Sequence, residues 1–160
     1  MGTTTLLFLI KKSGDKISHV CLAMKKRSFG KGRWNGVGGK LNPGESVEEA
    51  VVRETKEEIG VHPKNITKVA ELDFAFPEHK KDWNQTAHVY FCDEWEGEPT
   101  ESEEMSPQWF HVDEVPFHAM WPDDIFWYPR VLQGEIIKGN FVFGDNDDVL
   151  EHTLKTIESF

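Results

Sequence analysis

The sequence is short of cysteine and of long apolar segments. Its two cysteines, Cys21 and Cys92, lie in or beside short apolar runs, which favours reduced core residues in a cytosolic protein over a disulfide or a reactive thiol. The longest uninterrupted apolar run, 6–10, is far shorter than the about 20 residues that a membrane span requires. Lysines follow it directly, so neither a span nor a signal peptide is predicted. We expect a cytoplasmic protein without a membrane association.

Basic residues are also scarce relative to acids. The 160 residues include 18 Lys and Arg against 28 Asp and Glu, a formal net charge of −10. Affinity gained by neutralising nucleic-acid phosphates needs a basic surface, so stable nucleic-acid binding is not expected. Internal repeats, low-complexity tracts and Pro/Ser-rich linkers are missing as well, and the length suits one core. We therefore expect a single domain over residues 1–160, with a monomer as the simplest assembly.

The apolar pattern predicts strands separated by turns and two helices. Ser46 and Glu49 form a capping box that opens a helix, and Gly60 can close it. Pro122 could start a second helix, which Pro129 would kink or limit. Strands are expected at 5–11, 19–24, 69–76, 87–91 and 109–112, with a long polar loop at 78–85. This alternation suggests a mixed sheet packed between helices.

The tail of the chain is ambiguous. Residues 141–143 are typical of a strand, whereas the spacing of the apolar residues in 149–157 suits a helix.

The first helix carries an unusual group of carboxylates. The apolar stripe of Val47, Ala50 and Val51 continues, one helical repeat later, as Glu54, Glu57 and Glu58. Taken alone, such a run is usually a solvated acidic face. However, these like charges crowd together near the negative end of the helix dipole, and burying them unpaired would be costly. A hard divalent cation, Mg²⁺ or Mn²⁺, would remove both objections.

The opposite side of this helix carries Glu49, Arg53 and Lys56. Glu49 and Arg53 have the i, i+4 spacing of a surface ion pair.

The segment from Gly39 to Val61 resembles a known signature. Gly39-x5-Glu45-x7-Arg53-Glu54-Thr55-Lys56-Glu57-Glu58-Ile59-Gly60-Val61 is similar to the Nudix box, G-x5-E-x7-R-E-U-x-E-E-x-G-U, with U aliphatic. Thr55 stands where the family usually has an aliphatic residue, so we expect a local packing change and no loss of chemistry. Further segments resemble the animal oxidised-purine nucleoside triphosphatases of the MutT-homologue group: 23–27, 29–30, 32–36, 101–105 and 120–124.

That resemblance implies a fold and a reaction. The fold would be an α/β/α sandwich around a central mixed sheet, with a strand at 141–143 and a closing helix after it. The reaction would be Mg²⁺-dependent hydrolysis of 8-oxo-dGTP and 2-oxo-dATP to the monophosphate and pyrophosphate, with Mn²⁺ as a possible alternative ion. Such enzymes sanitise the nucleotide pool and prevent mutation.

The resemblance also implies roles for individual residues around the phosphates. The metal ligands would be the Gly38 carbonyl and the side chains of Glu54, Glu57, Glu58 and Glu104. Glu58 or Glu54 would be the general base, and the sequence does not separate them. Arg53 would orient a catalytic carboxylate, with Glu45 as its partner. Lys25 is either a phosphate contact or an ordinary surface lysine.

Base recognition centres on Asp123 and Asp124. Their apolar neighbours Trp121 and Phe126 should raise at least one pKa, because burial disfavours the charged carboxylate. A protonated carboxyl can donate as well as accept a hydrogen bond, so the pair could bind an oxidised guanine in one protonation pattern and 2-oxoadenine in another. The alternative is that both acids simply begin a helix.

The remaining expectations concern the walls of the base site. Trp121 is expected to stack on the purine and Asn35 to hydrogen-bond with it, while Phe29, Phe74 and Phe76 are either pocket walls or core residues. Phe8 stands where the animal enzymes have a small Thr, and it would shift the purine if it lined the pocket. The loop at 78–85 is longer than in those enzymes and could alter access.

Two other functions remain open. One is a Nudix hydrolase of methylated purine triphosphates or dinucleoside polyphosphates. The other is a non-catalytic nucleotide-sensing module, although such modules commonly lose carboxylates of the box and this sequence retains all of them.

Overall fold

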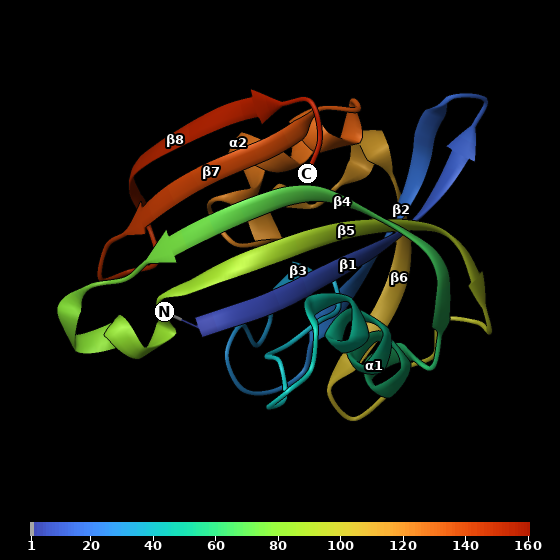
Figure 1. The fold of residues 1–160 in the computed structure, drawn as a ribbon, viewed down its shortest axis with the longest axis horizontal. Helices are drawn as coiled ribbons and strands as arrows, with labels where there is room; N and C mark the ends of the chain where they lie inside the picture. Colours follow the sequence, from blue (N-terminus) through green and yellow to red (C-terminus); the bar gives the residue numbers. More distant parts are fainter. Residues whose placement is uncertain (1) are drawn as a thin grey trace.

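The computed structural model describes residues 2–160, which form a mixed eight-stranded sheet with helices packed on it (Figure 1). The strands are β1 (Gly2–Ser13), β2 (Lys16–Lys25), β3 (Trp34–Asn35), β4 (His62–Ala75), β5 (Gln85–Glu96), β6 (Met105–His111), β7 (Ile136–Phe143) and β8 (Val149–Ile157). The helices are α1 (Val47–Ile59) and α2 (Asp124–Leu132), with short 3-10 turns η1 (Glu78–Trp83), η2 (Val112–Glu114) and η3 (Phe117–Ala119).

The order of the strands is β3-β2-β1-β5-β4-β7-β8, and β6 also pairs with β2. The pairs β1/β5 and β4/β7 are parallel, whereas the other neighbours are antiparallel. This confirms the expected mixed sheet.

The side chains of β1 point alternately to the two faces of the sheet, and each face has its own hydrophobic core. Phe8 and Ile10 pack with Trp127 and Tyr128 of α2, whereas the intervening Leu7 and Leu9 pack with residues of α1. Because successive side chains of a strand point to opposite faces, the two helices cover opposite faces of the sheet. Figure 1 shows this arrangement, with α1 in front of the sheet and α2 behind it. The expected sandwich is therefore confirmed.

The ends of α1 are as predicted. Ser46 accepts a hydrogen bond from the Glu49 backbone, and the Glu49 side chain accepts one from the Ser46 backbone. Gly60 ends the helix in the left-handed region, φ 71°, which costs glycine little. The second helix begins at Asp124, just beyond Pro122, and continues past Pro129, so Pro129 does not end it. Within residues 2–160, neither helix combines the length and apolar character of a membrane span.

The closing helix expected after residue 143 is wrong. Residues 149–157 form β8, which pairs antiparallel with β7. The register sets Leu154 opposite Gly139, where an added Cβ would lie 2.6 Å from Leu154 Cδ2. The missing side chain of Gly139 thus makes room for Leu154, and this long-range packing outweighs the helical spacing of the apolar residues.

Candidate active site

Arg53 organises the acidic side of α1. Its Nε and Nη2 donate to the two carboxylate oxygens of Glu45, at 2.7 and 2.9 Å. This bidentate bond lowers the pKa of Glu45 to about 2. The predicted Arg53–Glu45 partnership is confirmed. The predicted Glu49–Arg53 pair is wrong, because the capping box holds the Glu49 carboxylate at the Ser46 backbone.

The same guanidinium also reaches two of the helical carboxylates. Arg53 Nη1 donates to Glu54 Oε1 at 2.8 Å and to Glu57 Oε2 at 3.2 Å. Glu54 is largely covered, whereas the Glu57 side chain is 58% exposed. One positive charge therefore offsets the repulsion among several acids.

Glu58 is the buried member of the group, with 2% of the residue exposed. Its Oε1 accepts a hydrogen bond from the Gly38 backbone at 3.0 Å, but its Oε2 is buried without a hydrogen-bond partner. Burial raises the pKa of Glu58 to about 8, and the Glu54 carboxylate adds to that rise while Lys25 opposes it. An orphaned carboxylate oxygen beside further acids is a donor set that suits a hard cation.

The glycine loop between β3 and α1 brings these carboxylates to β1. A Cβ at Gly38 would lie 1.7 Å from the Thr5 carbonyl oxygen, and one at Gly39 would lie 2.7 Å from Glu54 Oε1. Only glycine permits such close approach of the backbone. The loop pairs with β1 through bridges at Leu7↔Val37 and Thr4↔Lys40.

Glu104 takes a different partner in this structure. Its Oε1 accepts a hydrogen bond from Arg27 Nη2 at 3.2 Å. Among residues 2–160, no three His, Cys, Asp or Glu side chains converge closely enough to form a metal-binding group in this conformation. The ligand set of Gly38, Glu54, Glu57, Glu58 and Glu104 stays a prediction.

A cavity of about 310 Å³ adjoins this loop and brings together most of the predicted substrate contacts. Its lining includes Gly38, which hydrogen-bonds Glu58, and Gly39, which lies beside Glu54, so the glycine loop separates the cavity from the carboxylates of α1. The predicted residues in its lining are Lys25, Phe29, Asn35, Phe74, Phe76, Trp121, Asp123 and Asp124. The phenylalanines among them thus line a cavity and also take part in the aromatic packing around it.

Asp123 and Asp124 line this cavity and are 3% and 4% exposed. The two carboxyls are hydrogen-bonded to each other, and Trp127 Nε1 donates to Asp123 Oδ2 at 2.8 Å. Burial raises the pKa of Asp123, and burial together with the Asp123 charge raises that of Asp124 well above its usual range. The raised pKa values favour one proton shared between the two carboxyls. The predicted pKa rise is confirmed.

Comparison with known proteins agrees with this geometry. The family described as NUDIX domain matches residues 3–131. The chain belongs to the Nudix family. The oxidized purine nucleoside triphosphate hydrolase of Mus musculus is 44% identical over 144 residues, 88% of this chain and 89% of that protein. Its counterpart from Danio rerio is 44% identical over 139 residues, 87% and 88% of the two chains.

Solved structures support the Nudix fold. The crystal structure of a mutator MutT protein from Bacillus halodurans superimposes with a TM-score of 0.82, at 27% identity, over 97% of this chain and 98% of that one. Nudix hydrolases generally need divalent metal ions, which fits the acidic helix.

Two sequence-based expectations about the Nudix base pocket are wrong. Phe8 does not line the cavity: it is 1% exposed and packs against Tyr128 at 4.7 Å between ring centroids, on the α2 side of the sheet. The part of β1 that lines the cavity is Thr4 to Leu6. Phe126 does not line the cavity with the acid pair, because its ring packs against His152 at 4.3 Å between centroids and remains partly exposed.

Sequence reasoning missed other residues of the pocket. Trp127 follows Asp123 by four positions, a helical spacing that could have identified it as the hydrogen-bond donor. Phe143, at the end of β7, stacks on Phe76 at 4.9 Å between centroids and lines the cavity. Arg33 also lines it, and no local sequence pattern marks that residue.

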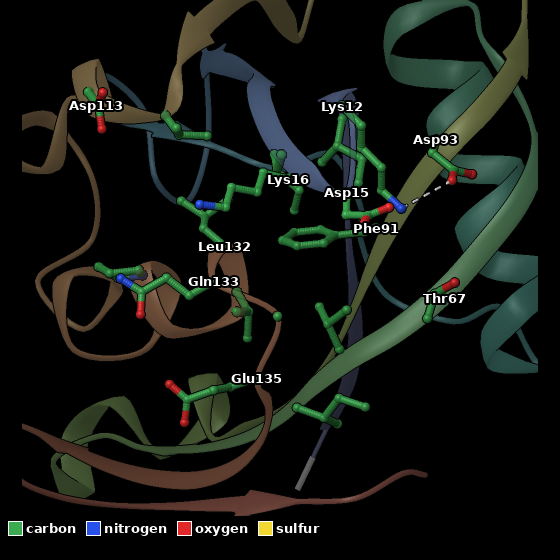
Figure 2. Close-up of a pocket in the computed structure, with 18 of the residues that line it drawn as sticks. Lys12, Asp15, Lys16, Thr67, Phe91, Asp93, Asp113, Leu132, Gln133 and Glu135 are labelled. Atoms are coloured by element: carbon green, nitrogen blue, oxygen red, sulfur yellow. Dashed lines mark ion pairs between the residues drawn. The ribbon is translucent and has the colours of Figure 1, made fainter.

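A second, larger cavity of about 820 Å³ lies elsewhere in the Nudix domain (Figure 2). Its walls come from β1, β2, β4, β5 and the end of α2, and the Lys12–Asp93 ion pair at 3.7 Å spans part of its rim. It shares no lining residue with the base pocket and contains none of the predicted site residues.

Proposed function

We propose that this Nudix domain, over residues 1–160, hydrolyses oxidised purine nucleoside triphosphates, 8-oxo-dGTP and 2-oxo-dATP, to the monophosphate and pyrophosphate. It would thereby sanitise the nucleotide pool and limit mutation. The observation that carries the proposal is the buried Asp123–Asp124 pair in a cavity whose lining includes Gly38, the residue that hydrogen-bonds Glu58 of α1. The names of the mouse and zebrafish relatives support the same substrate class.

The acid pair provides a means of recognising the base. With one carboxyl of the pair protonated and the other ionised, the site would offer one donor and several acceptors in a buried setting. Moving the proton changes that pattern, which would allow two differently substituted purines to bind. Trp121 would stack on the base, and Asn35, Phe29, Phe74 and Phe76 would complete its surroundings.

The α1 side would hold the triphosphate and the ion, Mg²⁺ or alternatively Mn²⁺. When bound, the ion would neutralise phosphate charge and make a coordinated water more acidic. Glu58 is favoured as the base that takes the proton of the attacking water, because no nitrogen donor occupies its Oε2 whereas Glu54 is bonded to Arg53. Lys25 would contact phosphate. The residues proposed to hold the ion are Glu54, Glu57, Glu58, Glu104 and the Gly38 carbonyl.

The net charge bears on the compartment, the assembly and the partners of the protein. We propose a cytoplasmic monomer without stable nucleic-acid or membrane binding, because the chain carries a net charge of −10.

The test is pyrophosphate release from a panel of canonical, oxidised and methylated purine triphosphates and dinucleoside polyphosphates. The parent should strongly prefer 8-oxo-dGTP over dGTP. Glu58→Gln should lower kcat by about 10²–10⁴-fold, the range for loss of a general base. The matched control is Glu48→Gln, an exposed acid on the same helix, which should leave turnover unchanged.

Each other function would give a different result in this panel. Equal turnover of 8-oxo-dGTP and dGTP would exclude the sanitising role. Preference for a methylated triphosphate or a dinucleoside polyphosphate, unaffected by Asp123→Asn, would indicate another Nudix substrate. Tight nucleotide binding without pyrophosphate release would indicate a sensing module.

A further inference from the structure

One loop surrounds the indole of Trp121 on several sides. The loop follows β2 and contributes Phe29, whose ring centroid lies 4.9 Å from that of Trp121. A Cβ at Gly30 would lie 3.4 Å from Trp121 Nε1, so the backbone there contacts the indole edge. Arg33 places its guanidinium carbon 4.0 Å from the indole centroid, the geometry of a cation–π contact.

Arg33 is itself held from the other end of the sheet. Its Nη2 donates to Asp147 Oδ2 at 3.3 Å, and both side chains are largely covered. Asp147 lies in the turn between β7 and β8 with φ 61°, a left-handed conformation that Asp and Asn tolerate better than most residues.

That turn has a second attachment. Lys80 of η1 donates from Nζ to the Asp145 carbonyl at 2.9 Å, and the Gly144 backbone donates to the Asp148 carbonyl at 2.8 Å. The turn is thus a fixed support, and it presents Asp147 to Arg33 in a defined position.

We propose that Arg33, anchored by Asp147, is a positioning residue that holds the Trp121 indole in the orientation at which it stacks on the base. This inference deepens the proposed function, on which it rests. Arg33 lines the base cavity, and the planar guanidinium restrains the planar indole in a way that a flexible lysine ammonium does not. Trp121 on its own would keep the freedom of its two side-chain torsions.

Arg33 has a second effect that the experiment must separate. Its positive charge lowers the pKa of both Asp123 and Asp124, although burial dominates at each. Arg33→Lys retains the charge and removes the planar stack, whereas Arg33→Met removes both. Lys31→Met, an exposed charge on the same loop, is the matched control.

Steady-state kinetics are measured with the nucleotide that the full-length parent turns over best. Arg33→Lys and Arg33→Met should both raise KM by about tenfold, the size of a covered cation–π contact, with kcat within about twofold of the parent. Asp147→Asn should raise KM less, because the stack survives without its anchor. The control should match the parent. If Arg33→Lys keeps the parent KM, or if kcat falls with KM unchanged, the positioning role is wrong.

A readout independent of turnover completes the test. The Trp121 indole N–H resonance, assigned with Trp121→Phe, should shift in the Arg33 and Asp147 variants and stay in place in Lys31→Met. An unmoved resonance overturns the proposal even if the parent prefers oxidised purines. A shifted resonance with a raised KM supports it, whichever purine the panel identifies. If nothing is turned over, the proposed function fails, and calorimetric affinity for the tightest-binding nucleotide replaces KM.

Discussion

Two clusters of neighbouring carboxylates in this protein reduce the repulsion between like charges in different ways. At α1, the guanidinium of Arg53 hydrogen-bonds the carboxylates of Glu45, Glu54 and Glu57, so a cation lies among these acids. At the start of α2, Asp123 and Asp124 are bonded to each other, and a proton replaces the cation.

The position of each cluster on its helix makes the comparison informative. The dipole of a helix favours anions at the N-terminus, where the Asp pair lies, and disfavours them near the C-terminus, where Glu57 and Glu58 lie. Yet the pKa of Asp124 is raised well above its usual range. Burial therefore outweighs the helix dipole, and the chemistry of each cluster depends on its access to water and cations.

Among the changes that test this comparison, removing the cation of the first cluster should have the largest effect. Arg53→Met leaves the carboxylates of Glu45, Glu54 and Glu57 without their shared partner, so their orientation is lost. Turnover should fall by about 10–100-fold, as for loss of residues that orient metal ligands, and Mn²⁺ affinity measured by calorimetry should fall in parallel.

The control for this variant is Arg130→Met. Arg130 forms an ion pair with Glu135 at 3.0 Å outside the lining of the base cavity, and its loss should leave turnover unchanged. Turnover of Arg53→Met within about twofold of the parent would contradict the orienting role.

An intermediate effect is expected from replacing Asp124, in the second cluster, by a residue that cannot ionise. Asp124→Asn keeps a donor toward Asp123 but cannot titrate, so kcat/KM for 8-oxo-dGTP and 2-oxo-dATP should change unequally, by about tenfold. Equal changes for both substrates would argue against proton-dependent base recognition. Asp15→Asn, in an exposed turn, is the control.

The same variant should alter the pH dependence of stability. The pKa of Asp124 in the folded protein lies well above the unfolded value of about 3.9. Between these two pKa values the unfolded chain ionises more readily than the folded protein, so the free energy of unfolding falls as the pH rises. Asparagine removes this decline. In thermal unfolding, Asp124→Asn should therefore melt higher than the parent near neutral pH, and the difference should vanish below about pH 3.9. A lower melting temperature at neutral pH would contradict a buried neutral acid.

The smallest effect is expected from a substitution at Thr55, on the face of α1 that packs against the sheet. Thr55 is fully buried and donates from Oγ1 to the Val51 carbonyl at 2.7 Å, which satisfies its hydroxyl within the helix. Thr55→Val restores the aliphatic residue usual in the Nudix box. It should change the free energy of unfolding by less than about 1 kcal/mol in denaturant titrations and leave turnover unchanged. A larger loss would mean that the hydroxyl has a structural role of its own.

The sequence predicted best where local signals act together. The capping box at Ser46, the left-handed Gly60 and the apolar stripe all concern residues within a few turns of each other, and α1 follows them. The prediction of a closing helix at 149–157 was wrong because the spacing of the apolar residues there is compatible with a helix. The pairing of β8 with β7 depends instead on the space beside Gly139, which the local spacing does not show.

The residues of the site also separate into those that the sequence predicted and those that it did not. Seven positions named for the base pocket, together with Lys25 named for the phosphates, line one cavity, because the family resemblance included them. Phe8 lies on the same face of the sheet as the cavity, but its ring is buried against Tyr128, a contact between β1 and α2 that only the tertiary structure shows. Arg33 was missed because its partners Trp121 and Asp147 are distant in the chain.

By itself, the sequence determined the helix with its carboxylates, the glycines beside it and the family to which the chain belongs, because these are encoded at short, fixed spacings. Only the tertiary structure decided which acids have raised pKa values. That outcome depends on burial and on partners from other elements: Gly38 reaches Glu58 from the glycine loop, and Asp124 is 4% exposed beside Asp123. The same carboxyl group binds cations where it is charged and donates a hydrogen bond where it is neutral.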